Sequence, residues 1–426
     1  MDLKERLNRL TSISKSQPEE KSQVLSDLRQ RLNRLIEPKK TYRKKEIIPI
    51  EQLVKGEVIS TPAGETFRTK QYFPPHHRYG EMALADILSI PTYPAHLLSR
   101  DERLKELDFR KALFLDTETT GLSGGTGTFA FMVGLGFFQE DRFLITQFFM
   151  RDYSEERASL SLLKNVIDSF QFLVTFNGRQ YDIPLLETRF ILSRIVSKIR
   201  EMPNFDLLYP SRRIWKGAYE NCRLVTLESQ LLGVERADDI PSEWIPYLYF
   251  EYIQTGDARK IQQVFYHNQM DILSMVALAG RIHLVYHDPQ AARHRKGIEH
   301  FALGKLFWEH GQRGKAIPCF EIALKRCDDD LSWEVMKWLS RAFKKTGQAE
   351  KAKSLWEEMM SWPYKKDAFP YIELAKYHEH RLKDWNRAMA YVDEALDFIA
   401  PHQQKEIELL RHRRQRLEQK KILRAV

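Results

Sequence analysis

The stretch Ala112-Leu-Phe-Leu-Asp116-Thr-Glu118-Thr-Thr-Gly-Leu122 decides the fold of this chain. It begins as a short apolar run, which is typical of a buried strand, and continues into acidic and small residues. Side chains two residues apart point to the same face of a strand, so Asp116 and Glu118 are expected to project together. Such carboxylates repel each other and raise each other's pKa, and a hard cation such as Mg²⁺ or Mn²⁺ removes that repulsion. The stretch therefore predicts a strand with a pair of acids on one face. Such a pair can bind a metal ion, but surface strands also carry paired acids by chance, so the other acids of the domain have to support this interpretation.

Strand and helix patterns are mixed in the segments that follow. Further strands are expected at 129–138, 142–150 and 172–176, and helices at 155–170, 181–198, 224–232 and 258–286. This mixture is typical of an α/β sandwich. We expect the α/β domain to cover residues 108–286.

Three more acids stand at notable places in this domain. Asp182 follows an expected strand and opens a helix, where an N-cap is the ordinary role of an acid. Asp271 lies in an apolar helical segment, one turn after His267 and on the same face. Asp206 either supports a site from behind or caps a helix or strand.

The order of these acids resembles that in the DEDD family of 3′→5′ exonucleases. Asp116–Leu122 is similar to the first motif of that family, Asn177-Gly-x3-Asp182 to the second, and His267-Asn-x2-Asp271 to the third. The resemblance implies an α/β fold of the ribonuclease H-like type, with a mixed sheet flanked by helices.

Other segments resemble the bacterial YprB-like proteins more specifically. They are Asp239-Ile-Pro, Tyr249-Phe-x-Tyr252 and the stretch 267–274. In YprB-like proteins an exonuclease-type domain precedes tetratricopeptide repeats, so the resemblance implies the same organisation here.

The resemblance implies a metal-dependent phosphodiester hydrolase that acts as a 3′→5′ exonuclease on single-stranded DNA or RNA. Two divalent cations, Mg²⁺ or Mn²⁺, would activate water and stabilise the transition state. Their ligands would be Asp116, Glu118, Asp182 and Asp271. The residues beside the terminal nucleotide would be Thr119, Gly121, Leu122, Asn177 and Tyr181. Asp206 would support the site without touching the substrate.

The third motif departs from the larger exonuclease subfamilies in its base. Those subfamilies have Tyr four residues before the Asp or His five before it, whereas Tyr266 is here at −5 and His267 at −4. If the helix is continuous, His267 shares the face of Asp271, and its ordinary pKa of about 6.5 suits proton transfer at neutral pH. We expect His267 to be the general base, with Tyr266 as the second choice if the helix begins near residue 268.

Residues 294–400 are helical and repetitive. Three segments share one spacing, and their leading alanines are 36 residues apart: Ala316-x3-Phe320-x2-Ala323, Ala352-x3-Trp356-x2-Met359 and Ala388-x3-Val392-x2-Ala395. Small residues at fixed positions let paired helices approach closely, and the period is near that of tetratricopeptide repeats. We expect an all-α, tetratricopeptide-like domain that binds a protein partner through a concave surface.

The formal charge of +9 on the 426 residues is concentrated at the two ends. Residues 1–45, expected to form basic helices and a linker, carry a net charge of +7. Residues 401–426, expected to form a basic helix, carry +5, and the middle, 46–400, carries −3. The charge therefore predicts that the two tails bind the phosphates of nucleic acid without sequence preference.

Composition also indicates the compartment. Three cysteines without a CxxC pair favour a reducing environment. The most apolar run, 129–138, is far shorter than the roughly 20 residues that span a bilayer, and no apolar signal region is visible near the N-terminus. We expect a cytoplasmic protein without a membrane partner. The lead-in region 46–107 has mixed strand and turn signals and no chemistry that can be assigned.

Two other functions fit the same residues. The chain could be a non-catalytic adaptor that holds nucleic acid and recruits a protein through its repeats. It could also be a structure-specific endonuclease on the same fold.

Overall fold

The computed structural model describes residues 46–106, 108–121, 126–289, 296–363 and 365–425. The expected basic segment 1–45, the expected substrate contact Leu122 and most of the linker after the α/β domain lie outside these ranges. Contacts divide the chain into the units Met1–Ile48 and Pro49–Val426, and every element below belongs to the second unit.

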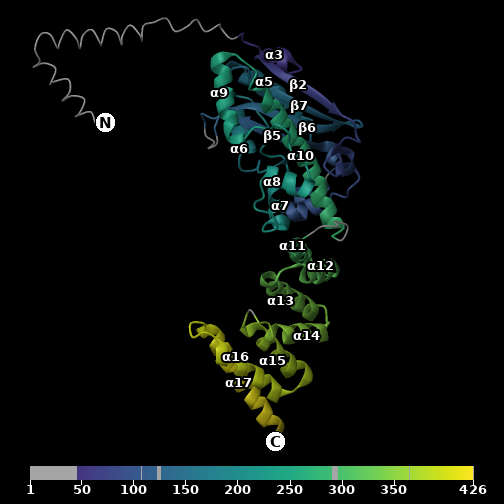
Figure 1. The fold of residues 1–426 in the computed structure, drawn as a ribbon, viewed down its shortest axis with the longest axis vertical. Coiled ribbons are helices and arrows are strands. Elements are labelled where there is room, and N and C mark those ends of the chain that lie inside the picture. The colour runs from purple at the N-terminus through teal and green to yellow at the C-terminus, as the bar shows by residue number, and fades with distance from the viewer. Residues whose placement is uncertain (1–45, 107, 122–125, 290–295, 364, 426) are drawn as a thin grey trace, which may run out of the picture. The chain divides into compact units, whose positions relative to one another are not determined.

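A seven-stranded mixed sheet organises the α/β domain (Figure 1). The strand order is β1-β2-β7-β6-β5-β8-β9; neighbours from β1 to β5 are antiparallel, and β5, β8 and β9 are parallel. The strands are β1 (Gly56–Thr61), β2 (Gly64–Phe73), β5 (Ala112–Thr119), β6 (Ala130–Gln139), β7 (Arg142–Phe149), β8 (Phe172–Thr175) and β9 (Asn204–Asp206). The predicted mixed sheet with flanking helices is therefore confirmed. The hairpin β1–β2, from the lead-in region, extends it beyond β7.

Helices cover both faces of the sheet (Figure 1). Helix α10 (Gln262–His287) packs on one face, and α5 (Glu156–Asp168) and α6 (Asp182–Leu192) pack on the other. The alternation along β5 explains the two cores: Phe114 joins the apolar cluster of α10, and Leu115 joins that of α5 and α6. Asp116 and Glu118 follow Phe114 by two and four residues, so their side chains also lie on the α10 face of the sheet.

Shorter elements complete the domain. They are α3 (Ile50–Leu53), β3 (Arg78–Tyr79), β4 (Met82–Ala83), η2 (Leu84–Leu88), α4 (Pro94–Ser99), η3 (Glu102–Leu104), η4 (Phe109–Lys111), η5 (Tyr153–Glu155), α7 (Leu208–Trp215), α8 (Leu224–Leu227), η6 (Glu228–Leu232), η7 (Ser242–Trp244) and α9 (Ile245–Thr255). The helix expected at 181–198 is shorter than predicted and ends at Leu192, since Arg194 has a left-handed φ of 56°. The helix expected at 224–232 consists of α8 followed by the π-helical turn η6.

The C-terminal part of the described chain is helical, as predicted. Its elements are α11 (Gly297–Glu309), α12 (Arg313–Arg326), α13 (Asp329–Lys345), α14 (Ala349–Met360), α15 (Ala368–Tyr377), η8 (His378–Leu382), α16 (Trp385–Phe398) and α17 (Gln404–Ala425). Consecutive helices pack on one another, and the three repeated alanines, Ala316, Ala352 and Ala388, are fully buried on α12, α14 and α16. None of the helices that the structure describes is long and apolar enough to cross a membrane.

Candidate active site

Two glycines of β6 let α10 lie close to the sheet. Gly134 pairs with Asp116 on β5 and with Gln147 on β7, and a Cβ atom at this position would lie 2.0 Å from Oδ1 of Asn268. At Gly136 a Cβ atom would lie 2.4 Å from a side-chain carbon of α10. Any larger residue would push the helix away. The glycines thus bring the polar side chains of α10 down to the acids of β5.

The first and third motifs meet between β5 and α10. Single ligand atoms of Glu118, His267 and Asp271 all lie within 4.8 Å of one another. Glu118 and His267 are 8% and 3% exposed, whereas Asp116 and Asp271 are partly buried. Carboxylates and an imidazole at such distances can bind a metal ion together.

Burial and repulsion from neighbouring acids raise the pKa values of Asp116, Glu118 and Asp182. Burial raises the pKa of Asp116 well above its usual range, and the charges of Asp271, Glu118 and Asp182 raise it further. Burial also raises the pKa of Glu118 to about 8, against the opposing effect of His267. Burial raises the pKa of Asp182 to about 6. The repulsion expected from the spacing of Asp116 and Glu118 therefore extends to all four acids.

Asp206 fixes the loop that carries the second motif. Its buried carboxylate accepts hydrogen bonds from the backbone N–H groups of Asn177 (2.7 Å) and Arg179 (3.0 Å). Asp182 follows this loop as the first residue of α6, and Thr117 of β5 donates a hydrogen bond to it (2.5 Å). Asp206 therefore caps the turn before Asp182, and Thr117 ties Asp182 to the strand of the first motif.

Helix α10 is continuous through the third motif, which was the condition for placing His267 beside Asp271. Nδ1 of His267 lies 2.9 Å from Oδ1 of Asp239, and Nε2 lies 3.6 Å from Oδ2 of Asp271. Burial by itself lowers the pKa of His267, but the hydrogen bond with Asp239 and the charges of Asp271 and Glu118 raise it to about 9. Tyr266, in contrast, is 37% exposed.

Arg236, which no sequence pattern indicated, is a buried cation that pairs with three acids. The Arg236 side chain is 4% exposed and forms ion pairs with Glu228, Asp239 and Asp271. It lies outside the helices and strands, so no periodicity could indicate it. Asp239 stood in a segment that carried the family resemblance, but its contact with His267 joins residues 28 positions apart and was not foreseen.

A chain of amides and a hydroxyl positions Asp116. Nδ2 of Asn268 donates to Oδ2 of Asp116 (2.8 Å), and Nε2 of Gln147 donates to Oδ1 of Asn268 (3.0 Å). This series of hydrogen bonds continues to β2, where the Thr69 hydroxyl donates to Oε1 of Gln147 (2.9 Å). The lead-in region 46–107, for which no chemistry was assigned, thus supports the first acid of the site.

The expected substrate contacts have different surroundings. Thr119 donates to the carbonyl oxygen of Gly121 (2.9 Å), which closes a local turn after β5. Asn177 has a left-handed φ of 65°, and its side-chain oxygen is buried without a hydrogen-bond partner in the described part of the chain. Tyr181 is 56% exposed and is open to a ligand.

Comparison with known proteins agrees with this architecture. The model of the RNase_H superfamily matches residues 113–283, the segment that contains both motif-bearing elements β5 and α10. This match indicates a nuclease-type hydrolase. RNase H-like domains usually use divalent metal ions. The chain is also 32% identical over 354 residues to "Uncharacterized protein YprB" of Bacillus subtilis (strain 168). The aligned region covers 82% of this chain and 84% of that relative. The chain therefore belongs to the family of YprB, with an RNase H superfamily domain followed by a helical region.

Proposed function

We propose that this protein is a DEDD-type exonuclease that hydrolyses single-stranded DNA or RNA from the 3′ end. The observation that carries the proposal is the convergence of four carboxylates, from Asp116, Glu118, Asp182 and Asp271, whose charges raise the pKa of Asp116. Burial penalises each charge, and although Arg236 pairs with Asp271, no cation pairs with Asp116 in the described part of the chain. A role in binding cations explains why the fold keeps this cluster.

The donor set suits two hard divalent cations, Mg²⁺ or Mn²⁺. Carboxylate oxygens are the ligands these ions prefer. Asp116 accepts a hydrogen bond from the neutral amide of Asn268, which does not compensate its charge. Bound cations would neutralise the acids and would stabilise the charge that develops on a phosphodiester during hydrolysis.

The protein's own residues would handle the proton. Nε2 of His267 faces the acids and would take the proton from an attacking water. Asp239 at Nδ1 would fix the ring orientation and the tautomer of His267. Asn268 would hold Asp116 in place for its ligand role.

Metal binding should release protons. Glu118, with a pKa of about 8, and His267, with a pKa of about 9, hold protons at neutral pH that a cation must displace. Each displaced proton makes affinity rise about tenfold per pH unit, so Mn²⁺ affinity should rise at least that steeply between about pH 6 and pH 8. Calorimetric titration in buffers of different ionisation enthalpy measures the released protons directly. Equal affinity at both pH values would contradict this account of the site.

His267 and Tyr266 offer a matched pair for testing the base. We expect His267→Gln to lower the hydrolysis rate by about 10²- to 10⁴-fold, and Tyr266→Phe to leave it nearly unchanged. Asp239→Asn removes an interaction that raises the pKa of His267. Because the base must be neutral, the acid limb of the pH–rate profile at saturating Mn²⁺ should then move down by roughly one unit. A larger loss in Tyr266→Phe than in His267→Gln would assign the base to Tyr266.

Labelled oligonucleotides test the substrate and the polarity. A 5′-labelled single strand with a free 3′ end should shorten one nucleotide at a time, and blocking the 3′ end should stop this. Internal cuts in a strand blocked at both ends would indicate an endonuclease. Binding without any metal-dependent cleavage of DNA or RNA would favour the non-catalytic adaptor.

The helical region supports a tetratricopeptide-like assignment. The 36-residue spacing places a buried alanine on the second helix of three successive pairs, α11–α12, α13–α14 and α15–α16. Close packing of paired helices through small residues is what such repeats require.

A further inference from the structure

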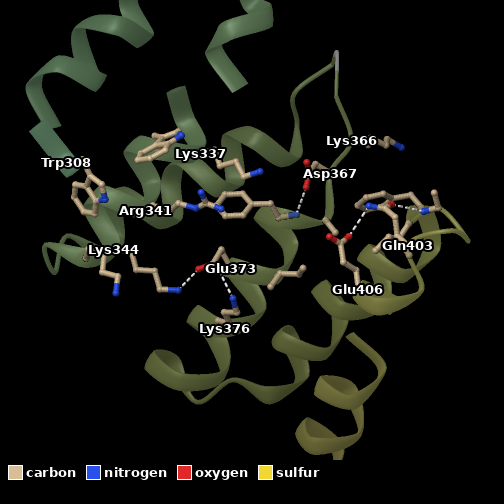
Figure 2. A pocket seen from close by; sticks show the side chains of 18 residues that line it. Trp308, Lys337, Arg341, Lys344, Lys366, Asp367, Glu373, Lys376, Gln403 and Glu406 are labelled. Atoms are coloured by element: carbon tan, nitrogen blue, oxygen red, sulfur yellow. Dashed lines mark hydrogen bonds and ion pairs between the residues drawn. The ribbon is translucent and has the colours of Figure 1, made fainter. Parts of the chain in front are cut away.

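A pocket in the helical region gathers basic and aromatic side chains (Figure 2). It has a volume of about 970 Å³ and is bordered by α11, α13, α15, α16 and the start of α17. Six lysine or arginine residues and three acidic residues line it. The pocket is therefore positively charged, although residues 46–400 as a whole have a net negative charge.

The cations form a row along α13. Lys337, Arg341 and Lys345 are spaced four residues apart, so they follow one side of the helix at intervals of about 6 Å. Lys366, from the segment before α15, adds a fourth. None of these four forms an ion pair with an acid in the described part of the chain, whereas Lys344 and Lys376, the other two cations, both pair with Glu373. Four positive charges are thus left for a ligand.

Aromatic rings lie among these cations. The Lys337 ammonium and the Arg341 guanidinium lie 5.3 and 5.1 Å from the centre of the Phe369 ring, which is partly buried. Trp308 and Trp338 also line the pocket and are partly buried. Aromatic faces and guanidinium planes are the surfaces on which unpaired bases stack. Contacts with Phe369 also hold two of the cations over the pocket.

We propose that this pocket binds a short stretch of single-stranded nucleic acid, with the α13 cations on the phosphates and the aromatic rings against the bases. A nucleic acid strand carries one negative charge and one stackable base per nucleotide, which suits a pocket that offers both a row of cations and aromatic rings. An acidic protein segment would use the cations but not the aromatic surfaces. The inference rests on the proposed function only for the class of ligand, because the pocket shares no residue with the candidate active site.

Charge reversal in the pocket tests the proposal in the full-length protein. Binding of a fluorescent ten-nucleotide DNA or RNA single strand is measured by anisotropy in EDTA, so that metal-dependent contacts are absent. Lys337→Glu/Arg341→Glu should weaken binding by about tenfold or more. The slope of the logarithm of the binding constant against the logarithm of the salt concentration should become shallower by roughly 1.4, or about 0.7 per lost phosphate contact. The control Lys325→Glu/Lys383→Glu makes the same charge change at exposed positions outside the pocket and should bind like wild type.

Each outcome decides the proposal. Equal binding by the pocket variant and the control, or no binding by the wild-type protein, would overturn it. A glutamate decapeptide that displaces the oligonucleotide at equal concentration would assign the pocket to acidic proteins instead. If the helical circular dichroism of the pocket variant is lost, Lys345→Glu/Lys366→Glu replaces it, since both side chains are exposed.

A second readout separates this proposal from the proposed function. Hydrolysis of bis(p-nitrophenyl) phosphate with Mn²⁺ needs no contact with the pocket and should be unchanged in Lys337→Glu/Arg341→Glu. Absence of this hydrolysis in the wild-type protein would contradict the proposed nuclease activity. It would not affect the binding result in EDTA.

Discussion

Replacing Asp116 by Asn should abolish metal-dependent hydrolysis, with the single-turnover rate falling on the order of 10³-fold. Burial raises the pKa of Asp116, and the charges of the other three acids, Asp271, Glu118 and Asp182, raise it further. The Asn side chain has nearly the same shape and can still accept the hydrogen bond from Asn268, but it cannot act as an anionic ligand. Rates are compared with those of Asp141→Asn, which removes an exposed charge in the turn between β6 and β7.

The same change should stabilise the metal-free protein. A group whose folded pKa is raised lowers stability as pH rises above its unfolded pKa of about 3.9. Asp116 is such a group, so Asp116→Asn should raise the melting temperature in EDTA by a few degrees at about pH 8 and by nothing below about pH 4. Mn²⁺ should reverse the order, because it stabilises the wild-type protein more. If the variant is less stable than the wild-type protein in EDTA at pH 8, burial and repulsion of the Asp116 charge do not destabilise the metal-free protein.

Gly134→Ala should destabilise the protein by roughly 3 kcal/mol and remove most of its activity. The added methyl group would lie 2.0 Å from Oδ1 of Asn268, so either α10 or the Asn268 side chain must move. Either movement breaks the hydrogen bond that holds Asp116. Denaturant unfolding and the hydrolysis rate measure the two effects.

A helical glycine provides the control for Gly134. A Cβ atom at Gly314 in α12 meets nothing within 4 Å, so Gly314→Ala should stabilise by up to about 1 kcal/mol. Removing the clashing side chain in an Asn268→Ala background should make the Gly134 substitution much less costly. Equal costs of Gly134→Ala in both backgrounds would show that the close approach to Asn268 is not what requires glycine.

Local patterns were sufficient to predict β5, β6, β7 and β8, but not the short strand β9 or the hairpin β1–β2. The i, i+2 spacing of Asp116 and Glu118 and the i, i+4 spacing of His267 and Asp271 depend only on strand and helix geometry, and the structure keeps both. What could not be predicted depends on sheet register. The row from Asp116 through Gly134 and Gln147 crosses three strands, so no single segment could reveal it.

The positive pocket of the helical region also depends on packing. Residues 46–400 carry a net charge of only −3, and most of the positive charge of the sequence lies in the two tails. Packing brings Lys366, from the segment before α15, to the same pocket as Lys337 and Arg341 of α13, whereas Glu373, one of the three acids of the pocket, is paired with Lys344 and Lys376. A mean over sequence does not contain that arrangement, because it arises only when helices distant in sequence become neighbours.

The central claim is that the four acids hold divalent cations for phosphodiester hydrolysis. It is tested most directly by incubating a 5′-labelled single strand with Mn²⁺ and either the wild-type protein or Asp116→Asn, after both have been shown to be folded. We expect a ladder of products shortened from the 3′ end with the wild-type protein, no ladder in EDTA, and none with Asp116→Asn. Equal degradation by the two proteins, or no degradation of DNA or RNA by the wild-type protein at any Mn²⁺ or Mg²⁺ concentration, would contradict it.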